Sequence, residues 1–98
     1  MKNLFLMLVT YTQPIEVIDE ILADHREFLK QGYKEGKLLV SGPQEPREGG
    51  VIIGCFKDKQ EAIDFSKKDP FSLKNAATYQ IFEFNPVLHQ DFLSDFLS

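Results

Sequence analysis

The sequence lacks tryptophan and has only one cysteine and two histidines among its 98 residues. The single cysteine, Cys55, cannot form an internal disulfide, so we expect a reducing, cytoplasmic location. The histidines and the cysteine lie far apart in the sequence, without the spacing of a metal site. No phosphate-binding loop, GxSxG elbow or dinucleotide fingerprint is found either. We therefore predict no metal and no organic cofactor.

Positive charge is also scarce, since 15 acidic residues outnumber 11 basic ones and the net charge is −4. No cluster of lysine and arginine is apparent in the sequence. Nucleic-acid binding requires clustered lysine and arginine, so we expect no nucleic-acid partner. The apolar run near the start, residues 4–9, is too short for the core of a secretory signal and is followed by no small-residue cleavage site. We expect a buried strand there and no membrane partner.

Apolar and charged residues are present in the proportions of one globular domain. Strands are predicted at residues 4–10, 38–41, 51–56 and 77–84, helices at 15–35 and 59–68, and a short helical turn at 71–74. Gly42-Pro43 is expected to end the second strand, and residues 44–50 to form a loop with a two-glycine turn at its end. The element order predicts an α+β, ferredoxin-like βαββαβ fold with a four-stranded antiparallel sheet and both helices on one face.

The first and third strands are continuously apolar, as expected of inner strands. The sheet face opposite the helices would then carry apolar side chains, and we predict a homodimer that stacks two such faces. Residues 1–86 are expected to form the domain and residues 87–98 an amphipathic helical tail of the same domain. The tail would cover its own sheet or a second subunit through one apolar helical face, formed by Leu88, Phe92, Leu93, Phe96 and Leu97.

His25 lies within the apolar stripe of the first helix, where the helical repeat predicts leucine or isoleucine. Packed against a core, an imidazole needs partners, because unpaired polar burial costs about 1–3 kcal/mol. One interpretation is a core histidine bonded to a backbone carbonyl. The other is a catalytic or ligand-binding histidine in a small cleft beside the helix.

Asp69 is the most attractive partner for His25, because Asp69-Pro70-Phe71 marks a helix start just after the second helix. A plain N-cap would explain Asp69 by itself. The two roles are compatible, since one carboxylate oxygen can cap the helix while the other orients the imidazole as a general base.

Four further residues have weaker claims to a functional role. His89 is expected at the surface or an interface, and Cys55 as a buried, unreactive strand residue with a raised pKa. Arg26 is expected on the solvated face of its helix. Arg47, in the loop before the third strand, is able to reach an anionic ligand, although loop arginines more often contact only water.

The segment HREFLKQGYKEGKLLVSGP, which starts at His25, and the Asp69-Pro70-Phe71 corner resemble the YciI-related (YCII) domain family. The resemblance runs to about Phe84 and leaves out the tail. It implies a ferredoxin-like protein that dimerises as an α/β barrel, with a His–Asp pair in the active site at His25 and Asp69. Some relatives are dehydrochlorinase-like enzymes acting on chlorinated hydroxyquinols, and the wider superfamily includes muconolactone isomerases.

Two functions are consistent with these features. The first is a cofactor-independent lyase or isomerase in which His25 moves a proton on a small oxygenated cyclic substrate, Asp69 sets its tautomer, and Tyr33, Ser41 and Gly42 line the pocket. General acid–base catalysis supplies about 10²–10⁴ in rate, which suits elimination or enolisation. The second is a non-catalytic homodimeric module, ligand-binding or stress-associated, in which the His–Asp pair is only structural. A solvent-reachable cavity at the pair would favour the enzyme.

Overall fold

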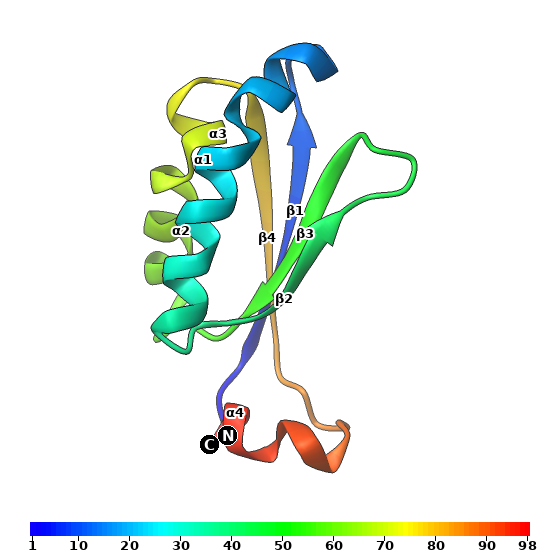
Figure 1. The fold of residues 1–98 in the computed structure, drawn as a ribbon. Coiled ribbons are helices and arrows are strands. Elements are labelled where there is room, and N and C mark those ends of the chain that lie inside the picture. The colour runs from blue at the N-terminus through cyan, green and yellow to red at the C-terminus, as the bar shows by residue number, and fades with distance from the viewer.

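A computed structural model describes all 98 residues, and its antiparallel sheet has the strand order β2-β3-β1-β4. The strands are β1 (Leu4–Tyr11), β2 (Leu38–Pro43), β3 (Gly49–Gly54) and β4 (Ala77–Phe84), and the helices are α1 (Ile15–Lys34), α2 (Lys59–Lys68), α3 (Pro70–Leu73) and α4 (Ser94–Leu97), with a 3₁₀ turn η1 (Asp91–Leu93) before α4. Helices α1, α2 and α3 lie on one side of the sheet (Figure 1). The predicted ferredoxin-like α+β fold, with β1 and β3 inside, is confirmed. None of its helices has both the length and the apolar character that crossing a membrane requires.

The core lies between the sheet and the helices. Side chains alternate between the two faces of a strand, and on β1 the buried residues Phe5, Met7 and Val9 face the helices. On α1 the buried residues Ile18, Ile21 and Leu29 recur at helical spacing and pack onto them. Burial of these two apolar faces holds α1 against the sheet and thereby places the rest of its stripe, His25 included.

The opposite face of the sheet is apolar and is not covered by helices. Leu6 of β1 pairs with Phe82 of β4 and with Ile53 of β3, so these three side chains share that face. Phe82 and Phe84 are 47% and 43% exposed. The expected apolar face, with residues from β1, β3 and β4, is therefore present.

The β2–β3 hairpin is longer than predicted. Gly42 and Pro43 continue β2, and Gly49 and Gly50 begin β3, so the predictions of a strand end and a two-glycine turn were wrong. The glycines serve close packing, since a Cβ on Gly49 would lie 1.8 Å from the carbonyl oxygen of Val9. Only residues 44–48 remain as the hairpin loop.

The tail is not one amphipathic helix. It turns below the end of the sheet, where both termini meet (Figure 1), and is helical only over η1 and α4. Leu97 is buried against Leu4 and Cys55, whereas Leu88 and Phe92 are 93% and 82% exposed. The predicted common apolar face was wrong, because residues 87–90 are not helical and the chain buries Leu97 while it leaves Leu88 and Phe92 exposed.

Candidate active site

The corner between α2 and α3 fixes Asp69. A residue before proline is held out of the helical region, and Asp69 has extended φ and ψ of −62° and 131°. Its Oδ1 atom accepts a hydrogen bond from the backbone N–H of Phe71 at 3.0 Å, as predicted for an N-cap followed by Pro70 at the first helical position. The side chain is completely buried, so it needs further hydrogen-bond donors.

His25 and Tyr79 supply those donors. The Nδ1 atom of His25 lies 2.8 Å from Oδ1 of Asp69 and 3.0 Å from Oδ2, and the Tyr79 hydroxyl donates to Oδ2. A carboxylate only accepts hydrogen bonds, and all three of its partners can donate. Burial, and then the charge of Asp69, raise the pKa of Tyr79 well above its ordinary range, so the phenol remains a donor. Asp69 thus joins α1, α3 and β4.

The same geometry fixes the tautomer of His25. Since Asp69 accepts, Nδ1 carries the proton, and in the neutral ring Nε2 has the free lone pair. Nε2 has no hydrogen-bond partner within the chain, and no buried side-chain nitrogen or oxygen is left unpaired, so Nε2 is reached from solvent. The His25 side chain is 12% exposed. It therefore has one anchored nitrogen and one open nitrogen.

Phe71 sets the tilt of the imidazole. Its ring is stacked on that of His25, with centroids 4.1 Å apart and an angle of 18° between the planes. Phe71 is itself buried and edge-on to Tyr11, so it cannot turn aside. The Asp69-Pro70-Phe71 corner thus holds the His25 ring both by a hydrogen bond and by a packed face.

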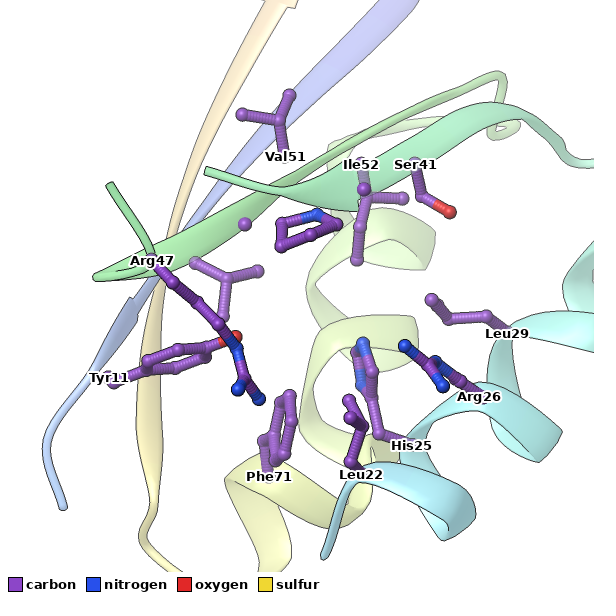
Figure 2. Close-up of a pocket in the computed structure, with 14 residues that line it drawn as sticks. Tyr11, Leu22, His25, Arg26, Leu29, Ser41, Arg47, Val51, Ile52 and Phe71 are labelled. Atoms are coloured by element: carbon purple, nitrogen blue, oxygen red, sulfur yellow. The ribbon is translucent and has the colours of Figure 1, made fainter. Parts of the chain in front are cut away.

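A cavity of about 500 Å³ lies in front of His25, between α1 and the helix-facing side of β2 and β3 (Figure 2). This volume is within the range of about 300–1,000 Å³ that is usual for small-molecule sites. Half of its lining residues are hydrophobic, among them Val9, Leu29 and Ile52. The cavity is therefore able to hold a small, largely apolar molecule beside the open edge of the imidazole, where Nε2 lies.

The structure places two of the three predicted pocket residues in the cavity wall. Ser41 and Gly42 line the cavity. A bulge in β2 lets this happen, because the register shift between Leu38 and Val40 turns Ser41 to the side of its partner Ile52, toward the helices. Tyr33 does not line the cavity, and its hydroxyl forms a hydrogen bond of 2.7 Å with Ser41 instead. Tyr33 can therefore act on a ligand only through Ser41.

Sequence reasoning missed Tyr79 and undervalued Arg26 and Arg47. Both arginines line the cavity, and Arg47 pairs with Asp19 of α1 at 2.7 Å. Tyr79 could have been found from the alternation of side chains along β4, which places it on the helix-facing side of the sheet together with Ile81. For Arg47 no local pattern existed, since the β2–β3 hairpin brings it to the cavity, whereas Arg26 lies there because it follows His25 on α1.

The other candidates lie elsewhere. The Nδ1 atom of His89 is 2.9 Å from the backbone oxygen of Gln90 in the exposed tail. Cys55 is buried beside Leu97, and burial raises the pKa of its thiol, which agrees with the predicted inert role. No three side chains of histidine, cysteine, aspartate or glutamate lie close enough together to hold a metal ion.

Comparison with known proteins identifies the family. The family model described as "YCII-related domain" matches residues 4–85, from the start of β1 to just beyond β4. The chain belongs to this family. The YCII match thus covers the fold and the cavity and leaves out the tail. Among curated proteins, no significant match is found.

A solved structure shares the YCII-like fold of the chain. It is the 5-chloro-2-hydroxyhydroquinone dehydrochlorinase of Burkholderia phenoliruptrix in complex with 2,5-dihydroxybenzoquinone. The TM-score is 0.73, the sequence identity is 20%, and the match covers 84% of this chain and 93% of the dehydrochlorinase. At this identity the likeness establishes the fold alone.

Proposed function

We propose that this YCII-domain protein is a small enzyme in which His25 acts as a general acid–base. The observation that carries the proposal is the asymmetry of the imidazole, whose Nδ1 is held by a buried carboxylate while Nε2 is open to a cavity of ligand size. A histidine that served only the core would have both nitrogens enclosed. This geometry favours the enzyme over a non-catalytic module.

The proposed reaction begins when Nε2 of His25 takes a proton from a carbon or oxygen of the substrate. When the proton comes from a carbon next to a carbonyl group, the electron pair left behind forms a carbon–carbon double bond and gives an enolate. When it comes from a hydroxyl group, the pair stays on the oxygen as a phenolate or enolate. In an isomerisation, the imidazolium returns the proton at another carbon, and in an elimination a leaving group departs with its electron pair. Asp69 is the positioning residue, because its charge stabilises the imidazolium and its hydrogen bond holds the tautomer.

The substrate class follows from the cavity and agrees with the relative of known structure. The apolar walls of the cavity, which include the ring of Phe71, suit a planar ring that bears oxygen atoms. The dehydrochlorinase of similar fold acts on an oxygenated ring. We therefore propose a small oxygenated cyclic substrate, without a metal or organic cofactor, for this chain.

Self-association is part of the proposal. The bare sheet face has Val40, 52% exposed, on the edge strand β2 and the partly exposed Phe82 and Phe84 on the other edge strand β4, and a second copy would cover this apolar surface. A homodimer that stacks two sheets is the arrangement expected from the sequence.

The buried, single Cys55 needs no oxidising compartment, in keeping with the expected cytoplasmic location.

Hydrogen exchange into the substrate tests the proposal without knowledge of the product. The full chain would be incubated in D₂O with hydroxybenzoquinones, chlorinated hydroxyquinols and cyclic enol lactones, and deuterium uptake and chloride release measured. We expect one class to exchange faster than in buffer, and His25→Gln to lower that rate by about 10²–10⁴. Lys30→Gln, an exposed change on the same helix, should have no effect. Equal rates for wild type and His25→Gln would contradict the proposal.

A further inference from the structure

The charged side chains that line the cavity are all positive. Its only charged lining residues are Arg26 and Arg47, and no aspartate or glutamate lines it. The chain as a whole is acidic, with a net charge of −4, so two arginines without a lining carboxylate are a departure from the average surface. Two acidic groups pair with residues that line the cavity and are thereby engaged, Asp69 with His25 and Asp19 with Arg47.

The two arginines differ in what holds them. Arg47 is fixed by its ion pair with Asp19, and its guanidinium carbon lies 5.9 Å from the centre of the Tyr11 ring. Arg26 forms no ion pair within the chain. In the view of Figure 2 the imidazole of His25 lies between them, with Arg26 on the side of Leu29. Arg26 is therefore the positive charge at the cavity that has no counter-charge.

We propose that the cavity selects a planar organic anion, and that Arg26 binds its charged oxygen. Guanidinium groups bind carboxylates and enolates through paired, charge-assisted hydrogen bonds. An anion in this cavity would meet no lining carboxylate to repel it, and its ring would lie against apolar walls. The proposal rests on the proposed function, because it assumes that this cavity is the substrate site.

The same contact would assist the proton transfer. When Nε2 of His25 removes a proton, negative charge develops on the oxygen conjugated to the reacting carbon. A guanidinium already in place stabilises that charge without reorganisation at the moment of reaction. Arg26 follows His25 directly on α1, so one rigid helix carries both groups. Arg47, already paired with Asp19, would add a weaker second contact.

Ligand binding tests this inference separately from catalysis. Benzoate and benzamide have nearly the same size and shape but differ in charge, and both would be titrated into the full chain while the NMR signals of His25 and Phe71 are followed. We expect benzoate to bind at the cavity at least about tenfold more tightly than benzamide. Arg26→Gln should abolish this preference, and Arg47→Gln should reduce it less.

Lys30→Gln is the matched control, because it removes one positive charge from the same helix outside the cavity. It should keep the preference for benzoate. Arg26 is exposed, so its substitution is expected to leave the fold intact, which the spectrum reports directly. Equal binding of benzoate and benzamide by wild type, binding of neither, or an unchanged preference in Arg26→Gln would overturn the inference. If wild type prefers benzoate but His25→Gln leaves the rate of deuterium exchange into the substrate unchanged, the proposed function is refuted and the anion selectivity stands.

Discussion

The Nδ1 atom of His25 lies 2.8 Å from Oδ1 of Asp69, across 44 positions of sequence. The contact joins the middle of α1 to the corner before α3, and the Tyr79 hydroxyl brings β4 to the same carboxylate. Three elements therefore meet at one buried charge. A buried carboxylate with three donors is rigid, because the loss of any donor exposes its lone pairs to an apolar surrounding. This rigidity keeps the imidazole facing the cavity.

Tyr79→Phe should change the alkaline stability of the protein. Burial raises the pKa of Tyr79, so the folded chain keeps the phenolic proton at a pH where the unfolded chain, with an ordinary value of 10.0, has lost it. The unfolded state then binds fewer protons, and the free energy of unfolding falls by about 1.4 kcal/mol per pH unit above pH 10. Tyr79→Phe lacks this titrating group, so above pH 10 its free energy of unfolding should decline less steeply than that of wild type.

Urea unfolding of both proteins between pH 7 and pH 11 measures this difference. At pH 7 the variant should be less stable by about 1.5–3 kcal/mol, the usual effect of losing a hydrogen bond to a charged group. Above pH 10 the gap should narrow, since only wild type loses the contribution of Tyr79. Other tyrosines and lysines titrate in both proteins and cancel in the comparison. Parallel curves over the whole range would contradict the raised pKa of Tyr79 in the folded chain.

Phe71→Leu should separate ring positioning from stability. Leucine keeps most of the buried volume but cannot stack on the imidazole, whose ring centre is 4.1 Å away. We expect the free energy of unfolding to fall by about 1–2 kcal/mol, with the fold intact. The rate of deuterium exchange into the substrate should fall by about tenfold, because without the stacked ring the imidazole is less well aligned with the substrate. An unchanged rate in a correctly folded variant would mean that the stack does not orient His25.

The sequence allowed much of this site to be predicted, for physical reasons. His25 interrupts an apolar helical stripe, and Asp69 precedes a proline at a helix start, and both signals are local. Tyr79 and Ser41 depend on strand register instead. Ser41 faces the cavity only because a bulge in β2 shifts the pairing, and nothing in the sequence around Leu39 marks that bulge.

The arginines and the tail show the same limit. Arg47 reaches the cavity because β2 and β3 continue past the predicted ends, and that extension depends on the close approach of Gly49 to Val9. The tail was predicted from helical periodicity, but the burial of Leu97 at the end of the sheet decides its path. In both regions tertiary contacts override a local pattern.

Leu97→Ala tests whether the tail belongs to the domain. Leu97 is 1% exposed and packs against Leu4 and Cys55, so the substitution should lower the free energy of unfolding by about 2–5 kcal/mol. Leu88→Ala is the matched control, because Leu88 is 93% exposed and should contribute within about 0.5 kcal/mol. Urea unfolding measures both. Equal, small effects would mean that the tail is not part of the folded unit.

Phe82→Glu tests the predicted homodimer. Phe82 lies on the bare face of the sheet and pairs with Leu6 of the central strand β1. A charge there would be buried without a partner if two sheets stacked, so the variant should be a monomer while wild type is a dimer. Sedimentation velocity gives both masses. A monomeric wild type would contradict the proposed homodimer. A dimeric variant would show that the interface lies elsewhere on the surface.

The tautomer of His25 tests the central claim most directly, and long-range ¹H–¹⁵N NMR of the neutral imidazole measures it. The chain has only two histidines, so His25→Gln assigns the signals. We predict that wild-type His25 has the proton fixed on Nδ1, with Nε2 unprotonated. Asp69→Asn should lose this fixed state, because an amide can also donate to Nδ1. A wild-type ring protonated at Nε2, or exchanging between tautomers as free imidazole does, would contradict the account.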